Sequence, residues 1–216
     1  MNKRRLAIIL ASIAVIALIG GTYAAFTATS DPISKTVSTT KLKIDIEQSG
    51  DETKNYTIVN DSIEYTNMSA GEEINSPVRI INSENTPCYV RVTIYREWFK
   101  GQDKQTDTEK VNPAEIAVKT QSTDWIIKED TEDPEVLYCY YKTPVDGKDA
   151  TTNVMDQLMV LEGGQNKNTN AYADLSAQLT FEADAIQTGS VEKAMLAAWG
   201  VTASFDGDTL IDVAEQ

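Results

Sequence analysis

The chain has 216 residues, of which 41% are hydrophobic and 24% are charged, and it contains no histidine. This length is typical of one sizeable domain, and the apolar fraction is enough to fill a core. The formal net charge of −14 disfavours a nucleic-acid partner, because phosphate binding needs concentrated Lys and Arg. Without histidine no Ser-His-Asp triad, Cys-His dyad or HExxH zinc helix can form, so we expect no catalytic residue, metal site or cofactor.

The N-terminus reads as a signal peptide over residues 1–24. Lys3, Arg4 and Arg5 precede an apolar run from Leu6 to Ile19, and the small residues Thr22 and Ala24 follow it. The run of 14 residues is shorter than the roughly 20 that a spanning helix needs, so cleavage before Ala25 is favoured over a retained anchor. The mature chain then carries 16 basic and 33 acidic residues, a net charge of −17.

Alternation of apolar and polar residues dominates the remaining sequence and predicts about nine strands. The longest, Leu175–Ala185, places six apolar residues on one face and is expected to lie centrally in its sheet. The other predicted strands are Lys41–Glu47, Tyr56–Val59, Ser62–Tyr65, Val78–Ile81, Cys88–Tyr95, Asp124–Lys128, Val136–Lys142 and Gln157–Leu161. This pattern favours an antiparallel β-sandwich or barrel.

Few segments are typical of helices or loops. Residues 191–199 have helical spacing, with Ser190 to cap the start and Gly200 the end. A second short helix is predicted over Asn112–Lys119, with Pro113 at its first position. Lys100–Lys110 and Gly163–Asn170 are predicted to be surface loops, the second at the tip of a hairpin.

The two cysteines, Cys88 and Cys139, leave two possibilities open. Both lie in predicted strands, and an exported protein can hold a disulfide. Pairing requires adjacent strands with both side chains on one face. Otherwise the two residues act as small buried apolar side chains.

Acidic and aromatic clusters are the other candidates for chemistry. Glu129–Asp133 and Asp206–Asp208 are interpreted as solvated turns rather than calcium loops, because EF-hand spacing is absent. Trp98-Phe99 and Leu137–Tyr141 could line a sugar-binding groove, but aromatic residues in strands more often serve packing.

Several segments resemble one family of exported proteins. Gly20–Phe26 (G-G-T-Y-A-A-F) is similar to the signal region processed by the SipW-type signal peptidase, whose substrates include the biofilm-matrix protein TasA and the camelysins. Asn67–Asn82, the strand beginning Pro87-C-Y-V-R-V-T-I, and Ala183-D-A-I-Q with the later Ala197-A-W-G resemble segments of exported members of this family.

The resemblance implies a jelly-roll-like antiparallel β-sandwich over residues 41–216, with one or two short helices, preceded by the signal-peptide helix. It also implies a secreted structural or interaction protein of a Gram-positive biofilm matrix or cell surface. Its partners would be a SipW-type signal peptidase and further copies of itself or other matrix proteins, with membrane contact only through the uncleaved signal peptide. By this resemblance residues 25–40 form an extended donor segment that completes the sheet of a neighbouring subunit, with Phe26, Ile33 and Val37 as candidate anchors.

Two alternatives remain from other functional classes. One is a monomeric surface module that binds glycan or protein. The other, implied by the camelysin resemblance, is a metalloprotease, but zinc hydrolases typically use histidine ligands and this chain has none.

Overall fold

The computed structural model describes residues 42–46, 56–66, 69–106, 111–161, 172 and 174–215. The chain divides into two units, Met1–Ser38 and Thr39–Gln216, and every described residue belongs to the second. The predicted signal peptide, the segment 25–40 and the hairpin tip predicted at 163–170 lie outside the described residues.

Strands make up most of the described chain, as the alternating pattern predicts. The elements are β1 (Leu42–Ile46), β2 (Tyr56–Val59), β3 (Ser62–Tyr65), β4 (Glu73–Asn82), β5 (Cys88–Lys100), β6 (Asp103–Gln105), a 3-10 turn (Pro113–Glu115), β7 (Ile116–Lys119), β8 (Trp125–Glu129), β9 (Val136–Tyr141), β10 (Met155–Val160), β11 (Ser176–Gln187), α2 (Val191–Trp199), β12 (Val201–Asp206) and β13 (Thr209–Glu215).

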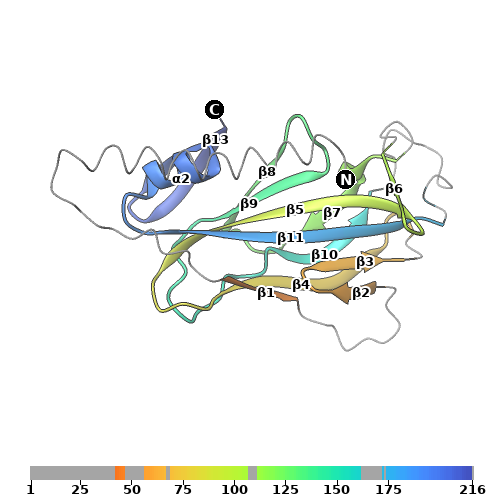
Figure 1. The fold of residues 1–216 in the computed structure, drawn as a ribbon, viewed down its shortest axis with the longest axis horizontal. Coiled ribbons are helices and arrows are strands. Elements are labelled where there is room, and N and C mark those ends of the chain that lie inside the picture. The colour runs from red at the N-terminus through yellow and green to blue at the C-terminus, as the bar shows by residue number, and fades with distance from the viewer. Residues whose placement is uncertain are drawn as a thin grey trace. The chain divides into compact units, whose positions relative to one another are not determined.

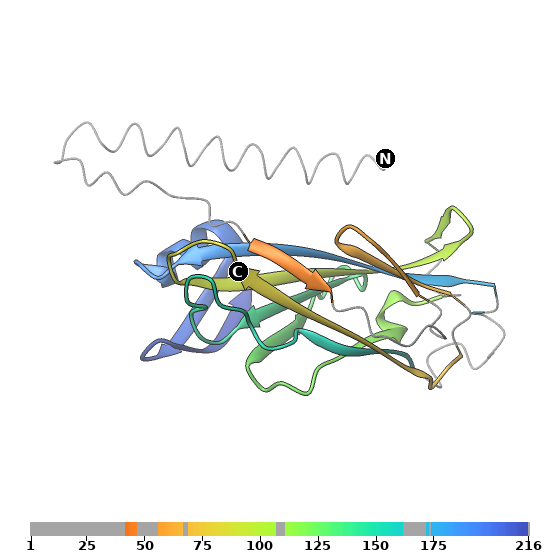
Figure 2. The same ribbon diagram turned by 90° about the horizontal axis from the view of Figure 1, so that it is seen from below.

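The strands form two packed sheets and a hairpin (Figure 1). The smaller sheet has the order β1-β4-β10-β7, and the larger has the order β2-β3-β11-β5-β9-β8, with β6 beside one end of β5. All the strand pairs of these described sheets are antiparallel. In Figure 2, β1 and the β2–β3 hairpin, both in orange tones, are seen as separate elements. The fold is therefore an all-β antiparallel sandwich, which confirms the predicted fold class.

The core lies between the two sheets and is built from the inward residue of each alternating pair. Phe181 and Leu179 of β11 are fully buried there, opposite residues such as Ile80 and Leu158 from the smaller sheet. β11 pairs with β3 on one side and with β5 over its whole length on the other. The prediction that this strand is central is confirmed, because its apolar face needs cover along its full length.

Strand β4 is longer than the predicted Val78–Ile81, and it contains a proline. Pro77 lies where the ladder with β10 shifts register, between the pairs Met155–Val78 and Gln157–Asn75. Ser76 and Pro77 of β4 thus oppose the single residue Asp156 of β10, which is a bulge. Proline has no N–H to donate to a ladder, so a bulge allows it within a strand that has neighbours on both sides.

The helix predicted over Asn112–Lys119 is wrong beyond its first turn. Asn112 accepts a hydrogen bond from the Ala114 N–H at 3.0 Å and caps a single 3-10 turn that begins at Pro113. From Ile116 the chain continues as β7, paired with β10. β-branched residues at Ile116 and Val118 favour a strand, and the sheet supplies the hydrogen bonds that continue it.

The predicted loop at Lys100–Lys110 is also wrong in part. β5 extends to Lys100, and β6 turns back to pair with it. Gly101, with φ of 60°, makes the turn between the two strands. Residues 107–110 lie outside the described part.

The helix α2 forms as predicted, but only its C-terminal cap matches the expectation. Gly200 has φ of 70° and donates its N–H to the Leu196 carbonyl at 3.2 Å. Ser190 stands at the N-cap position with φ of 57°, and its side chain makes no capping hydrogen bond.

The C-terminal segment after α2 forms the β12–β13 hairpin, which sequence analysis did not predict. Gly207 (φ 59°) lies in its turn. Together with α2 the hairpin covers one end of the outer face of the larger sheet and forms a second small core there (Figure 1). The sheet contributes Tyr89, Tyr140 and Ile186 to this core, and the C-terminal segment contributes Met195, Val201, Leu210 and Val213.

Candidate functional site

The residues predicted for cleavage and strand donation lie outside the described part of the chain. These are Thr22, Ala24, Ala25, Phe26, Ile33 and Val37. The proposals that concern them therefore depend on the surfaces that the described sandwich offers.

The two cysteines are free and fully buried. They meet two conditions for pairing, because both lie on the core face of adjacent strands, β5 and β9. The register prevents a bridge, since Cys139 stands opposite Val92, four residues along β5 from Cys88. Four residues of strand span about 13 Å, whereas disulfides need Cα atoms within roughly 7 Å. The candidate disulfide is thus not formed.

Burial also makes both thiols poor nucleophiles. It raises the pKa of Cys88 to about 11 and that of Cys139 to about 12. Because the thiolate is the reactive form, neither residue has the chemistry of a catalytic cysteine.

The acidic clusters serve as turns. Between β8 and β9, the Asp130 carboxylate accepts the N–H groups of Glu132 and Asp133 at 2.8 and 3.0 Å. Asp206–Asp208 forms the turn of the β12–β13 hairpin. No group of three or more His, Cys, Asp or Glu side chains within the described ranges is arranged to hold a metal ion.

Most of the aromatic candidates for a sugar-binding groove are packed into the molecule. Trp98 is buried in the main core, where its Nε1 donates to the Asn112 carbonyl at 3.1 Å, and Tyr140 is buried under α2. Tyr138 is half-buried on the outer face of the larger sheet. The packing therefore supports a role for these aromatic residues in the core rather than in a sugar-binding groove.

An arginine on the outer face attaches the C-terminal segment to the sheet. The Arg91 guanidinium lies 5.6 Å from the ring centroid of Tyr138 and 5.2 Å from that of Trp199 at the end of α2. It also donates to Asp184 at 2.7 Å. Cation–π contacts of this kind favour arginine, and here they join β5 to β9 and α2, while the ion pair with Asp184 adds β11.

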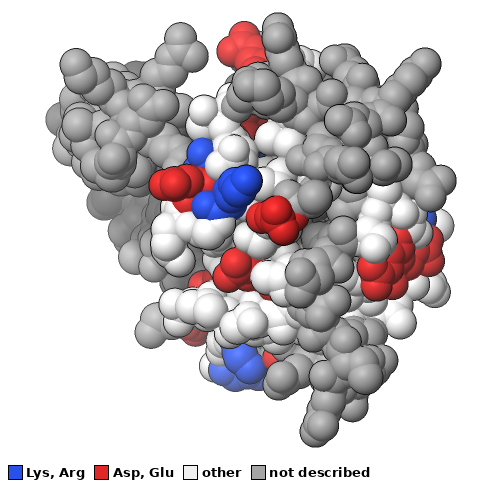
Figure 3. Space-filling view, turned by 90° about the vertical axis from the view of Figure 1, so that its right-hand side faces the viewer, with Lys and Arg blue, Asp and Glu red and all other residues white. Residues whose placement is uncertain are grey.

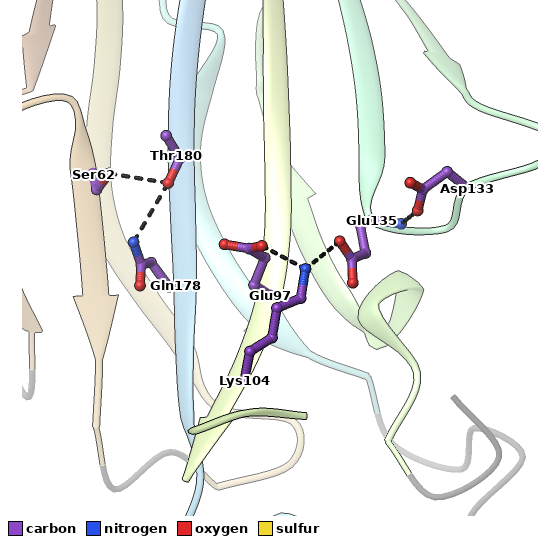
Figure 4. Close-up of polar contacts among 7 residues, drawn as sticks. All are labelled: Ser62, Glu97, Lys104, Asp133, Glu135, Gln178 and Thr180. Atoms are coloured by element: carbon purple, nitrogen blue, oxygen red, sulfur yellow. Dashed lines mark hydrogen bonds and ion pairs between the residues drawn. The ribbon is translucent and has the colours of Figure 1, made fainter. Parts of the chain in front are cut away.

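A nearly buried ion network lies at the other end of the same face (Figure 4). The Lys104 ammonium contacts Glu97 and Glu135 at 2.5 Å each, and all three side chains are less than one-fifth exposed. The Glu135 N–H donates to Asp133 at 3.0 Å, which extends the network into the β8–β9 turn. The network holds β6, β5 and this turn together, and its net charge is negative.

Beside it, the outer face carries neutral polar contacts. Ser62 and Thr180 share a hydrogen bond of 3.0 Å between β3 and β11, and Gln178 lies next to them (Figure 4). This face has no buried nucleophile paired with a base among its described residues.

The strand orders of the two main described sheets end in four strands, which are candidate pairing edges: β1 and β7 in the smaller sheet, and β2 and β8 in the larger. Three of these strands carry charged side chains. β1 has Lys43 and Asp45, β7 has Lys119, and β8 has Lys128 and Glu129.

The remaining edge strand, β2, reads Tyr-Thr-Ile-Val and has no charge. Natural sheets protect their edges with charged residues, prolines or bulges. β2 has none of these, and its Val59 side chain is 58% exposed. The alternating sequence predicts this strand but not its position at an edge.

The surface of the sandwich carries both charges without a basic patch in the view of Figure 3. Red acidic side chains are spread over the described surface of that end, and Lys and Arg occur in small groups among them.

Comparison with family models, with curated proteins and with solved structures finds no match to this chain. Among the described helices there is none with the length and hydrophobicity required to cross a bilayer.

Proposed function

We propose that this chain is an exported, non-enzymatic structural subunit of an extracellular matrix or cell surface, and that subunits join by strand donation. After signal-peptide cleavage, residues 25–40 of one subunit would pair with an edge of the sandwich of the next. An extended segment added to a sheet gains affinity from backbone hydrogen bonds and specificity from alternate side chains.

The observation that carries this proposal is that each main described sheet of the antiparallel sandwich ends in strands with a neighbour on one side only. One of these strands, β2, has no charged residue. A sheet edge is a template for a further strand. The SipW-type resemblance of Gly20–Phe26 adds a source for the donor, because cleavage there would free the following segment.

Charge supports residues 25–40 as the donor. This segment contains one acidic and one basic residue, Asp31 and Lys35, so its formal charge is zero. The rest of the mature chain carries the full net charge of −17. Two such bodies repel each other when packed face to face, whereas a neutral extended arm brings little charge against the neighbour.

An enzymatic function has less support. A metalloprotease would need a zinc site without histidine, and the two thiols are buried with raised pKa values. A glycan-binding module would need exposed aromatic rings, and Trp98 and Tyr140, which belong to the candidate clusters, are buried.

The test compares two chains, one starting at Ala25 and one at Lys41, by circular dichroism and electron microscopy. We expect fibres or oligomers from the longer chain and a folded, non-assembling domain from the shorter. A matched control keeps the full length but replaces Phe26, Ile33 and Val37 with serine, and it should fold without assembling.

Each other outcome has a defined meaning. Assembly of the chain starting at Lys41 would exclude the donor role. Loss of β signal in that chain would show that residues 25–40 belong to their own subunit's fold. A mature protein that stays monomeric on concentration would favour the monomeric binding module, and chelator-sensitive cleavage of casein would favour the protease.

A further inference from the structure

We infer that the acceptor for the donated segment is the outer edge of β2, where no described strand lies beside it, and that its occupant is residues 25–40 of a second copy. This inference rests on the proposed function and specifies its partner surface. It begins from the comparison of the four edge strands, of which only β2 lacks a charged residue within the described chain.

The hairpin geometry determines which backbone groups of β2 face its outer edge, away from β3. β2 and β3 are joined by the two-residue turn Asn60-Asp61, in which Asn60 has φ of 54°. Residues that flank such a turn form a hydrogen-bonded pair, here Val59 with Ser62. Bonded pairs alternate along an antiparallel ladder, so the N–H and C=O of Ile58 point away from β3.

The side chains of β2 also leave room for a further strand. Thr57 is exposed and Val59 is 58% exposed on the outer face. On the inner face, Tyr56 and Ile58 pack against the main core and are only partly covered. A strand laid beside β2 would therefore bury apolar surface on both faces at once.

The donor sequence fits this edge. Ile33 and Val37 lie on one face of an extended strand, since residues an even number apart share a face. They can cover the exposed parts of Tyr56 and Ile58. Lys35 lies between them on the same face, and a lysine on the new edge strand discourages addition of another strand. One edge would then accept one donor.

A second copy's β2 is a less favourable occupant of the same edge. Pairing β2 with β2 would bring two bodies of charge −17 side by side across a contact of only four residues per strand. The arm of 16 residues is neutral, so it brings no net charge of its own to the contact with β2.

The experiment is quenched hydrogen–deuterium exchange of the mature protein, in its assembled and its monomeric form, with resolution of single amides. We expect the Ile58 amide to exchange at least tenfold more slowly in the assembly. The Val59 amide, already directed to β3, should change little and serves as the internal reference. Protection confined to β1, β7 or β8 would overturn the β2 assignment while leaving strand donation intact.

A pair of variants tests the same edge by substitution. Thr57→Lys with Val59→Lys adds two charges to β2, and Glu64→Lys changes the net charge by the same amount on the same outer face of β3, opposite Thr57. We expect the first variant to stay monomeric and the second to assemble. Both variants should give the circular dichroism spectrum of the unsubstituted protein. Equal assembly of both folded variants would refute the β2 edge.

A synthetic peptide of residues 25–40 separates the failure of this inference from the failure of the proposed function. It should inhibit assembly of the mature chain and protect the Ile58 amide of the monomer. Inhibition without protection at Ile58 would place the donor on another edge. A peptide that neither inhibits nor protects would contradict strand donation itself, and protection of Ile58 in assemblies of the chain lacking residues 25–40 would indicate β2–β2 pairing.

Discussion

Phe181 offers the most direct test of how the sandwich is held together. Its ring is 1% exposed and lies in the main core on the central strand β11, opposite Ile94 of β5. Burying a phenylalanine side chain stabilises a protein by about 1.5–3 kcal/mol. Replacement by alanine also leaves a cavity of roughly 50–80 Å³, which costs about 1–2 kcal/mol. We therefore expect Phe181→Ala to lower the free energy of unfolding by about 3–5 kcal/mol.

Urea denaturation followed by far-UV circular dichroism measures this loss. The midpoint should fall while the slope with denaturant stays unchanged, because the same surface is exposed on unfolding. In a thermal melt the loss corresponds to a shift of about 6–20 °C for a domain of this size. Glu182→Gln, the next residue on the opposite, exposed face, is the matched control and should change stability by less than about 0.5 kcal/mol. A loss below about 1 kcal/mol for Phe181→Ala would refute the central position of β11.

Three further predictions concern charges and thiols. Native protein at pH 8 should react with a thiol reagent only after unfolding, because burial raises the pKa of Cys88 and Cys139, and its intact mass should show no loss of two hydrogens. The hydrogen bond from Arg79 lowers the pKa of the Asp45 carboxyl below its ordinary 3.8, so the pair stabilises β1 above this pH and the stabilisation is lost as the pH falls through the lowered value. Asp45→Asn should therefore reduce the melting temperature at pH 6, and this difference should shrink as the pH falls below 3.8. Lys104→Met should lower the free energy of unfolding by about 2–3 kcal/mol, because it leaves two nearly buried carboxylates next to each other without a cation. In a double-mutant cycle, adding Glu97→Gln should restore part of this lost stability.

The strand content was predictable because alternation is a local property. Residues two apart share a face, so a segment such as Leu175–Ala185 shows its buried side in the sequence itself. The same logic could have found the last hairpin, since Val201, Ala203 and Phe205 alternate with polar residues before the two turn residues Gly207-Asp208. The acidic residues of that turn indicated a solvated turn, and Ile211, the extra residue of a β-bulge in β13, breaks the alternation of the second strand.

The candidate sites depend on distances between remote segments, and these were not predictable. Cys88 and Cys139 share a face of neighbouring strands, as a disulfide requires, but the register of β5 with β9 offsets them by four residues. Lys104 meets Glu135 across 31 positions of sequence because β6 folds back along β5 next to the β8–β9 turn. No local sequence pattern indicates the register offset of the cysteines or the contact of Lys104 with Glu135.

The sequence by itself determined the absence of histidine chemistry, the acidic charge, and which residues of each strand face inward. These are properties of single residues and their nearest neighbours. Only the tertiary structure decided which strands end the sheets, and hence that the uncharged β2 lies at an edge while the uncharged β11 face is covered. The physical reason is that sheet order and register are set by the packing of the whole core, to which every strand contributes at once.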